Sequence, residues 1–415
     1  METFYALYEK LARGALAGGH EAALREVEKL DFDPHQLDCL LHPKQYAPVW
    51  RLSPCDCKEE ESACLGVCPF HAIRRDENGN IEIDQEACTG CSLCVDACKA
   101  KKLTQSKETL PVLEAVAAQT SPVYALIAPA FVSQFSERVT PGRLRSAFKA
   151  LGFAGMVEVA LFADILTLKE ALDFDELVRS EEDFLLTSCC CPIWIAMIRK
   201  VYGSLTPHIP ASVSPMIACG RAVKQLVPGA VTVFIGPCVA KKAEAREADI
   251  ADAVDFVLTF QEIQDVFDFA GVDPENMEED LRDHSSRAGR IYAHTGGVSE
   301  AVKTTLERLR PGRYIPLRAR QADGVPACKQ MLNELMQGAI RGNFLEGMGC
   351  VGGCVGGPKR LIPREEGALH VAHYGEAAPV RTPVDNPYVM ELLHRLGYES
   401  VESLTQEDTM FRRQF

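Results

Sequence analysis

The sequence predicts an α/β protein with mostly parallel sheets, preceded by a small α+β domain rich in cysteine and by a helical N-terminal segment. Three observations support this prediction. From Val123 onward, short apolar runs typical of buried strands alternate with longer helical patterns, which is the order found in parallel sheets. Between residues 49 and 104, eight cysteines lie close together. Before residue 49, apolar residues recur at helical spacing.

The composition is that of a soluble globular protein large enough for two or more domains. The chain has 415 residues, of which 47% are hydrophobic and 25% are charged. Its formal net charge of −14 argues against nucleic acid or an anionic membrane as the main partner. No apolar run reaches the roughly 18 residues that a membrane-spanning helix needs. The N-terminus, Met1–Tyr5, has no basic region and no twin arginine, so we expect no export signal and a cytoplasmic location.

The 17 cysteines indicate a metalloprotein with reduced thiols. A secreted disulfide scaffold is the alternative, but it suits short chains with a signal peptide. Here the cysteines form CxxC-type clusters, and three of them are consecutive at residues 189–191, which is a poor disulfide framework. The lone Cys39 is more typical of a small buried hydrophobic residue than of a metal ligand.

The first two predicted units are a helical segment over residues 1–48 and a cysteine-rich domain over residues 49–104. In the helical segment the apolar pattern ends at Pro34. In the cysteine-rich domain we expect a short hairpin within residues 74–83 that turns at Asn78–Gly79. Residues 105–122 then form a connector that is polar at first and helical afterwards.

The third unit, residues 123–415, is the α/β domain. Its expected strands cover residues 124–129, 184–187 and 231–235, and its expected helices cover residues 144–151, 165–178 and 327–341. The triplet Cys189–Cys191 directly follows one strand, and Cys238 follows another. Because ligands bind beyond the carboxyl ends of parallel strands, these cysteines can converge on one crevice.

One glycine pattern suggests a different ligand. Gly347–Gly352 matches the dinucleotide-binding pattern GxGxxG, which needs a strand before it and a helix after it. The stretch before it is helical up to about Gly342, and cysteines lie between the glycines. We therefore predict no nucleotide site there.

The cysteine-rich domain has the spacing of a two-cluster bacterial ferredoxin. Its second run is Cys88-x2-Cys91-x2-Cys94-x3-Cys98, in which the fourth cysteine serves the other 4Fe-4S cluster. Its first run, Cys55-x-Cys57-x6-Cys64-x3-Cys68-Pro69, is less regular. We expect one cluster on Cys68, Cys88, Cys91 and Cys94 and the other on Cys55, Cys57, Cys64 and Cys98. Two structural zinc sites are the alternative. Lys99 stands where a proline usually follows the fourth cysteine.

Three further motifs carry most of the chemistry. They are Thr187–Ser188–Cys189–Cys190–Cys191–Pro192, Gly236–Pro237–Cys238–Val239–Ala240–Lys241–Lys242–Ala243–Glu244 and Glu346–Gly347–Met348–Gly349–Cys350–Val351–Gly352–Gly353–Cys354. In order and separation they resemble the signature stretches of the iron-only (FeFe) hydrogenases, commonly written TSCCP, MPCxxKxxE and ExMxCxxGC. With the ferredoxin-like domain, the resemblance covers roughly residues 50–400. The triple cysteine is similar to that of the divergent branch often called group B.

This resemblance implies a catalytic domain of two lobes with mostly parallel sheets around an H-cluster. In that cofactor a 4Fe-4S cube shares one thiolate with a two-iron unit that carries CO, cyanide and an azadithiolate bridge. By resemblance Cys238, Cys350 and Cys354 are cube ligands, and Cys354 is the shared one. Lys241 would donate a charge-assisted hydrogen bond to cyanide. Without its motif, Lys241 would be interpreted as a solvated surface lysine.

The resemblance leaves two alignments of the cysteine triplet open. Alignment on Thr187 and Ser188 makes Cys190 the fourth cube ligand and Cys189 the proton-carrying thiol, and we favour it. Alignment on Pro192 and Trp194 makes Cys191 the ligand and Cys190 the proton-carrying thiol. In either case a thiol with a pKa around 8.5 can relay protons next to the cluster.

The resemblance also implies a proton route and residues that line the cofactor. Glu170 and Asp173 occupy the helix that carries the family's glutamate pair; a solvated helix face is the alternative. The serine that joins this pair to the thiol corresponds to Pro210, counted back from Ser214–Pro215. Ala128, Pro129 and Met348 are implied to contact the cofactor. Two departures from the family pattern are Gly236 in place of methionine and Ala130 in place of serine.

We therefore expect a hydrogenase that interconverts protons and H2, with electrons relayed through the two ferredoxin-like clusters. The resemblance implies a ferredoxin or flavodoxin as electron partner, and dedicated maturases that install the two-iron unit. A hydrogen sensor with slow turnover is one alternative, suggested by the altered residues around the cofactor. An iron–sulfur assembly or electron-transfer protein without the two-iron unit is another, although Cys354 and Lys241 are both present.

Overall fold

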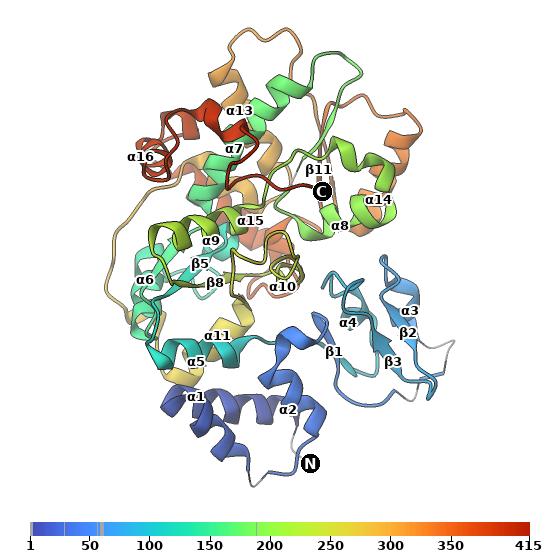
Figure 1. The fold of residues 1–415 in the computed structure, drawn as a ribbon, viewed down its shortest axis with the longest axis vertical. Coiled ribbons are helices and arrows are strands. Elements are labelled where there is room, and N and C mark those ends of the chain that lie inside the picture. The colour runs from blue at the N-terminus through green and yellow to red at the C-terminus, as the bar shows by residue number, and fades with distance from the viewer. Residues whose placement is uncertain (1–2, 29, 56, 59–61, 188) are drawn as a thin grey trace.

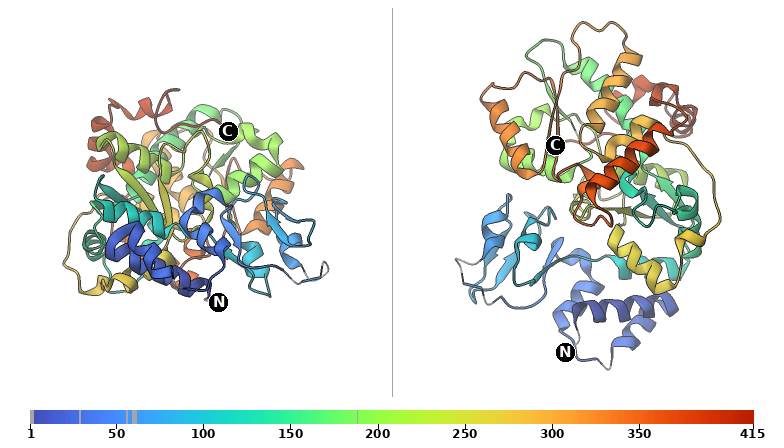
Figure 2. Two further views of the ribbon diagram at one scale, coloured as in Figure 1. Left: turned by 60° about the horizontal axis from the view of Figure 1, so that its bottom comes forward. Right: turned by 180° about the vertical axis from the view of Figure 1, so that it is seen from behind.

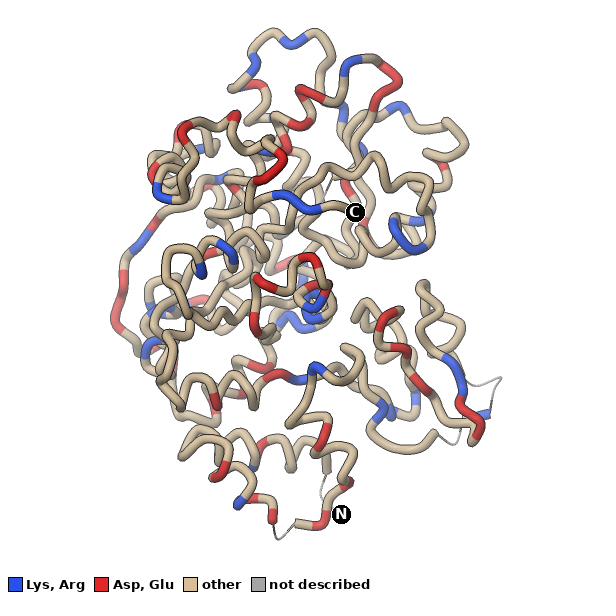
Figure 3. The backbone as a smooth tube through the Cα atoms, in the orientation of Figure 1, with Lys and Arg blue, Asp and Glu red and all other residues tan. Residues whose placement is uncertain are grey.

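The computed structural model describes residues 3–28, 30–55, 57–58, 62–187 and 189–415. Helices at the N-terminus, a small cysteine-rich part and a larger α/β part follow one another along the chain (Figure 1). The cysteine-rich part lies beside the α/β part in both the front view and the view from behind (Figure 2). Lys and Arg are interspersed with Asp and Glu through the described parts of the fold (Figure 3). None of the helices formed by the described residues has the length and apolar character that crossing a membrane requires.

The N-terminal helices differ from the prediction at Pro34. Helix α1 (Phe4–Val27) is kinked at Gly18 and Gly19 and packs against α5 (Thr109–Ala118). Pro34 does not end a helix; it is the first residue of α2 (Pro34–Leu41), and the Asp33 side chain caps that helix by accepting from the His35 N–H at 2.9 Å. Proline is favoured at the first helical position because no hydrogen bond is lost there. A short 3-10 turn, η1 (Pro43–Gln45), leads into the cysteine-rich part.

The cysteine-rich part consists of two small antiparallel pairs and two short helices. Strand β1 (Val49–Arg51) pairs with β4 (Leu103–Gln105), so the two ends of this part lie side by side. Strand β2 (Ile73–Arg75) pairs with β3 (Ile81–Ile83), which confirms the predicted hairpin. Gly79 adopts a φ of 78° in the turn, a conformation that glycine tolerates best. The helices are α3 (Ala63–Val67) and α4 (Leu93–Ala97).

The first lobe of the α/β part contains a parallel sheet with the strand order β6-β5-β8-β9. Its strands are β5 (Val123–Ile127), β6 (Gly155–Glu158), β8 (Val231–Gly236) and β9 (Phe256–Thr259). Its helices are α6 (Pro141–Ala150), α7 (Ala160–Leu177), α9 (Pro215–Leu226), α10 (Ala240–Glu244) and α11 (Phe260–Ala270). The predicted strands at 124–129 and 231–235 are thus confirmed to within two residues.

The second lobe contains a parallel sheet with the strand order β10-β11-β7. Its strands are β7 (Leu185–Thr187), β10 (Ala319–Asp323) and β11 (Phe344–Met348), and its helices are α8 (Pro192–Val201), α12 (Arg287–Arg290), α13 (Gly297–Leu309) and α14 (Val325–Met336). The central strand β11 was not predicted, because Glu346 and Gly347 weaken its strand signal. Both have local reasons: a Cβ at Gly347 would overlap the Trp194 ring, and the Glu346 carboxylate accepts from Gly296 N at 2.7 Å and Ser299 N at 2.8 Å at the start of α13.

Strand β11 lies where we expected a helical stretch before the glycine pattern, so the argument against a nucleotide site changes. A strand does precede Gly347–Gly352, but the element that follows is η7 (Cys354–Gly356), a 3-10 turn and not an α-helix. The pattern therefore lacks the helix N-terminus that binds pyrophosphate. The remaining elements are η3 (Pro129–Phe131), η4 (Gly203–His208), η5 (Pro274–Asn276), η6 (Ile291–Ala293), α15 (Arg364–Glu376), η8 (Pro383–Asp385), α16 (Pro387–Arg395) and η9 (Val401–Thr405).

Each lobe has its own apolar core, and the functional cysteines lie between the two. Cys189 belongs to the core of the first lobe and Cys191 to that of the second. Helix α7 contributes to both cores, with Ile165 in the first and Phe174 in the second. The predicted α/β fold with parallel sheets is therefore confirmed, and the junction of the two lobes is where the motifs meet.

Candidate active site

The three cysteine motifs follow strands of the two parallel sheets and lie at the junction of the lobes. The triplet follows the carboxyl end of β7, Cys238 follows that of β8, and Cys350 follows that of β11. Ser188 of the first motif lies outside the described residues. The Trp194 indole N–H donates to the Thr187 carbonyl at 2.7 Å, which fixes the chain at the entry to the triplet. The expected convergence beyond the strand ends is therefore present.

Four thiols interact electrostatically at this junction: Cys191, Cys238, Cys350 and Cys354. Burial, together with the charge of Cys191, raises the pKa of Cys238 to about 11 and that of Cys354 to about 12. Burial likewise raises the pKa of Cys350, together with the charges of Cys238, Cys191 and Cys354. Four thiolates crowded together are unfavourable unless a cation binds them, so the donor set fits a 4Fe-4S cube.

The loop that carries Cys350 and Cys354 depends on glycine for its close approach to neighbouring backbone. Gly353 has a φ of 85°, and a Cβ there would lie 2.8 Å from the Thr295 nitrogen. The Asp323 carboxylate accepts from Gly352 N and from Thr295 Oγ1, both at 2.9 Å. The loop is therefore anchored to Asp323 and packed closely against the backbone at Thr295.

The geometry favours the alignment of the triplet on Pro192. Cys191 is the triplet member that groups with the other three thiols, and its Sγ accepts from Gly349 N at 3.2 Å. The Cys190 thiol is buried, and its pKa is raised by burial and by Cys354 and Cys191, while Lys241 lowers it. The alignment that we favoured from the sequence makes Cys190 the ligand; its thiol interacts with Cys354, whereas Cys191 interacts with all three of the other thiols.

Lys241 is buried at the junction and is not a surface lysine. It is 6% exposed, and its Nζ donates to Glu244 Oε2 at 2.6 Å. Burial works to lower the pKa of Lys241, but the charge and hydrogen bond of Glu244, with Cys238 and Cys190, outweigh it and the pKa is raised. The ammonium therefore stays charged beside the thiols.

Glu170 and Asp173 are buried in α7 and do not form a solvated helix face. Glu170 Oε1 accepts from the Cys189 thiol at 3.1 Å, and Thr187 Oγ1 donates to Oε2. Burial raises the pKa of Glu170 to about 7, although the hydrogen bonds from Thr187 and Cys189 lower it. Asp173 Oδ2 accepts from Lys169 Nζ at 2.8 Å and from Ser212 Oγ at 3.4 Å.

Two of these partners were missed by sequence reasoning. Counting back from Ser214 led to Pro210, but the serine that contacts Asp173 is Ser212, because the loop before α9 brings residue 212 to α7. Lys169 was missed because a lysine next to acidic residues is usually a solvated helix residue; its 2% exposure sets it apart. The only signal in the sequence was its i, i+4 spacing to Asp173.

The residues expected to line the cofactor lie at the ends of β5, β8 and β11. The Ala128 N–H donates to the Ile235 carbonyl at 2.9 Å, Pro129 begins η3, and Met348 is 1% exposed. A Cβ at Gly236 would lie 2.8 Å from Phe234 Cε1 and 3.0 Å from Ala128 Cβ. The Phe234 ring thus fills the space that a side chain at position 236 would need, a compensation that the sequence did not reveal.

The cysteines of the cysteine-rich part interact with one another, and Cys94 interacts with Cys64 as well as with Cys91, Cys88 and Cys68. Burial raises the pKa of Cys55 and that of Cys64, and the charge of Cys98 also raises both pKa values. Burial raises the pKa of Cys91 to about 11, with contributions from Cys88 and Cys68. Burial also raises the pKa of Cys94, and Cys91, Cys88 and Cys68 add to it. Cys91 in turn raises the pKa of Cys350, so the Cys68–Cys94 group is the one nearer the junction of the lobes.

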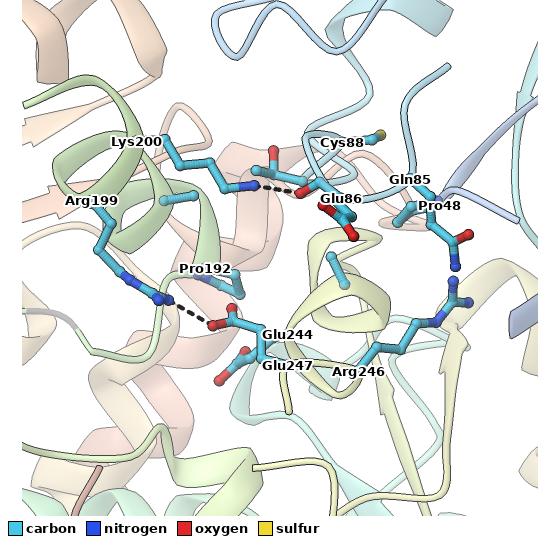
Figure 4. A pocket seen from close by; sticks show the side chains of 13 residues that line it. Pro48, Gln85, Glu86, Cys88, Pro192, Arg199, Lys200, Glu244, Arg246 and Glu247 are labelled. Carbon is cyan, nitrogen blue, oxygen red and sulfur yellow. Dashed lines mark hydrogen bonds and ion pairs between the residues drawn. The ribbon is translucent and has the colours of Figure 1, made fainter. Parts of the chain in front are cut away.

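A cavity of about 630 Å³ lies at the seam between the cysteine-rich part and the α/β part (Figure 4). Cys88 and Glu244 both line it. On its wall Lys200 Nζ donates to the Glu86 carbonyl at 2.7 Å, and Arg199 pairs with Glu247 at 2.7 Å (Figure 4). Helix α8, which begins directly after Cys191, is therefore tied at its other end to the loop that leads into Cys88.

The comparison with known families agrees with this arrangement. A family model described as the iron-only hydrogenase large subunit, C-terminal domain, matches residues 121–358. The chain belongs to this family. A family model described as a 4Fe-4S binding domain also matches residues 81–101, which contain the regular cysteine run.

Curated relatives of this iron-only hydrogenase family member are distant. The NADP-reducing hydrogenase subunit HndD of Solidesulfovibrio fructosivorans is 26% identical over 74% of this chain and 63% of its own length. The periplasmic iron hydrogenase large subunit of Nitratidesulfovibrio vulgaris is 28% identical over 54% of this chain and 64% of its own length. The nuclear prelamin A recognition factor of Homo sapiens is 25% identical over 74% of this chain and 81% of its own length. The chain thus spans less than two thirds of the first two relatives.

Solved FeFe-hydrogenases share the fold. HydA(deltaEFG) has a TM-score of 0.59 at 21% identity, and the match covers 73% of this chain and 98% of that one. A variant of the Chlamydomonas reinhardtii enzyme has a TM-score of 0.57 at 20% identity over the same shares. These likenesses place the two lobes described above in the hydrogenase fold.

Proposed function

We propose that this iron-only hydrogenase family member interconverts protons and H2 at an H-cluster, 2H⁺ + 2e⁻ ⇌ H2. The observation that carries this proposal is the grouping of Cys191, Cys238, Cys350 and Cys354 with the charged Lys241 and the free thiol of Cys190 beside them. A structural 4Fe-4S site would need only the four thiolates. A buried ammonium and an additional thiol are what a reactive two-iron unit next to Cys354 would use.

The roles of the protein's own residues follow from their contacts. When bound, the H-cluster supplies the iron chemistry that makes and cleaves H2. Cys354 would be the shared thiolate, and Lys241 would donate to an anionic ligand of the cluster while Glu244 fixes its orientation. Lys241 and Glu244 are both buried, which strengthens their charge interaction.

Protons would move along a row of side chains in α7 and the triplet. Cys190 Sγ would hold a proton next to the cluster, and Cys189 Sγ donates to Glu170 Oε1. From Glu170 the proton would pass to Asp173, three residues further along the buried helix, where Ser212 also donates. The extra cysteine of the triplet would thus lengthen the route by one thiol.

Electrons would pass through two 4Fe-4S clusters in the cysteine-rich part. The cluster on Cys68, Cys88, Cys91 and Cys94 would lie nearer the cube, since Cys91 is electrostatically coupled to Cys350. The cluster on Cys55, Cys57, Cys64 and Cys98 would be the outer one. A ferredoxin or flavodoxin would be the electron partner, and dedicated maturases would install the two-iron unit.

A second candidate is an iron–sulfur assembly or electron-transfer protein that lacks the two-iron unit. The similarity to the nuclear prelamin A recognition factor over 81% of that protein, whose name states no hydrogenase activity, favours a function without H2 turnover. A slow-turnover hydrogen sensor would share the H-cluster, and the changes at Gly236 and Ala130 favour that variant of the proposal.

Infrared spectroscopy of anaerobically matured protein tests the proposal. We expect sharp CO and cyanide stretching bands that shift when H2 or CO is added. A sample with full iron–sulfur content and proven maturases that shows no such bands would overturn the H-cluster and support the second candidate. If the bands are present, the rate of H2 turnover with a reduced dye separates an enzyme from a sensor.

A further inference from the structure

Lys169 is a buried cation for which the proposed reaction has no assigned role. Its side chain is 2% exposed, within a helix that is buried on almost every side. Lysine is almost never fully buried unless it is paired. Its Nζ donates to Asp173 Oδ2 at 2.8 Å, one turn further along α7. The cation therefore lies next to the outer end of the proposed proton route.

The groups around Lys169 and its neighbours Glu170 and Asp173 come from four elements, and three of the six are carboxylates. From α7 they are Glu170, Asp173 and Glu176; from the chain after β7, Cys189; from the loop before α9, Ser212; and from η6, Tyr292. The charge of Lys169 lowers the pKa of Asp173, of Glu170 and of Cys189, whereas burial raises all three. One buried ammonium thus influences three successive members of the route.

We propose that Lys169 is a positioning residue of this proton route, which holds Asp173 as an ionised, oriented proton acceptor. The inference rests on the proposed function, because it assigns Lys169 to the route that the reaction would use. Both described donors to Asp173, Lys169 and Ser212, bond to Oδ2. Oδ1 is therefore left to receive a proton that leaves Glu170.

The physical reason for a lysine at this position is the cost of a buried carboxylate. Without a paired cation, a buried carboxyl group takes up a proton instead of remaining charged. Ser212 supplies one hydrogen bond but no charge. A protonated Asp173 could not accept a further proton, so Glu170 would have no acceptor at neutral pH.

The test compares matured K169M, K169R and wild-type protein by two measurements. The first is the pH profile of H2 oxidation, in which protons must leave. The second is the infrared C=O band of a protonated carboxyl group. We expect K169M to keep the CO and cyanide bands, to shift its pH profile upward by about one unit or more, and to show a new carboxyl band at neutral pH. The K169M/D173N double variant should lack that band, and K169R should restore the wild-type profile.

K242M is the matched control. Lys242 is also fully buried and paired with a carboxylate, Glu262, at 2.9 Å, but it lies outside the route. A purely structural role for Lys169 predicts that K169M and K242M both lose stability and neither shifts the pH profile, and that outcome would overturn the inference. If K169M does not fold, K169Q replaces it and is measured alone and in the D173N background. In D173N, loss of the lysine charge should cause no further shift of the pH profile.

The two proposals fail in different ways. If wild-type protein with full cofactor content turns over no H2, the proposed function fails, and the carboxyl band still decides whether Lys169 keeps Asp173 ionised. If wild-type protein is active and K169M has the wild-type pH profile and no new band, the inference about Lys169 fails alone.

Discussion

Glu170 shows how burial prepares a side chain for proton transfer. Its carboxyl group is 1% exposed and accepts hydrogen bonds from Cys189 and Thr187. Burial raises its pKa from 4.5 to about 7 against the effect of those bonds. An acid that titrates near neutral pH can take up and release a proton at similar cost, which is the condition for efficient general acid–base catalysis.

The first prediction is that Glu170→Gln lowers H2 turnover by roughly 100-fold or more, the contribution typical of a positioned acid or base. Wild-type activity should show an inflection near pH 7 that the variant lacks. Glu346→Gln is the matched control, because Glu346 is also a buried carboxylate but caps α13. The prediction fails if the two variants have the same pH profile, or if Glu170→Gln keeps the inflection.

The second prediction concerns stability at the same residue. Because the folded-state pKa of Glu170 is raised, its contribution to stability is fully present below pH 4.5 and is lost as the pH rises through about 7. Over this range the free energy of unfolding of the wild type should fall by on the order of 3 kcal/mol more than that of Glu170→Gln. Denaturant unfolding at a series of pH values measures the difference, and parallel curves for the two proteins would contradict it.

The third prediction separates the members of the cysteine triplet. Cys191→Ala should lose the cube, since Cys191 groups with Cys238, Cys350 and Cys354. Cys190→Ala should keep the cube but lose roughly 100-fold or more in turnover, because the proton-carrying thiol is gone. Iron content and electron paramagnetic resonance distinguish the two. Cys328→Ala, a buried thiol near Cys191 with no proposed role, is the control. Loss of the cube in Cys190→Ala but not in Cys191→Ala would restore the gap-free alignment.

At the scale of single elements, β8 shows how one position compensates for another. Gly236 stands where the family has methionine, and Phe234, two residues earlier on the same strand, fills the space beside Ala128. Residues i and i+2 of a strand lie on the same face, so their volumes are linked. Phe234 also lies under Lys241, whose Nζ is 6.0 Å from the ring centroid.

The fourth prediction is that Gly236→Met alone destabilises the protein by about 1–3 kcal/mol, the usual cost of overpacking. A Cβ there would lie 2.8 Å from the Phe234 ring, so the ring must move. The Phe234→Ala/Gly236→Met double variant should recover part of the loss, which a double-mutant cycle measures. Gly203→Ala, with no atom within 4 Å of its Cβ, is the control and should be neutral. Additive effects of the two changes would refute the compensation.

Two of the three strands that carry cysteine motifs were predictable, whereas β11 and the supporting residues were not. Apolar runs located β5, β7 and β8, and the motifs after β7 and β8 fixed where they meet. Strand β11 was not predicted because Glu346 is set by its contact with α13 and Gly347 by its contact with Trp194. These partners are close in space but not in sequence. The contacts of Ser212 and Lys169 with Asp173 were not predicted for a similar reason, because they depend on how a loop and a helix fold together. Local patterns carry no information about such contacts.

At the scale of the whole molecule, buried charge joins the connector after the cysteine-rich part to the first lobe, and apolar contact joins the cysteine-rich part to the second lobe. Lys242 Nζ donates to the Ser106 carbonyl at 2.7 Å and pairs with Glu262 at 2.9 Å. Arg246 pairs with Glu108 at 2.7 Å. Cys68 and Cys91 pack against the core of the second lobe. These contacts place Cys68 and Cys91 beside the second lobe, and the proposed electron route depends on this placement.

The fifth prediction uses this arrangement to separate the outer cluster from the active site. Cys98→Ala should remove the proposed outer 4Fe-4S cluster, because Cys98 interacts electrostatically with Cys55 and Cys64. Turnover driven by reduced ferredoxin should fall, while turnover with a reduced dye and the CO and cyanide bands should persist, since the inner cluster and the seam are intact. Cys39→Ser, a 2% exposed thiol of α2 outside both groups, is the control and should keep all iron. Equal losses with both electron donors would mean that electrons do not enter through the outer cluster, and unchanged iron content would mean that Cys98 does not hold it.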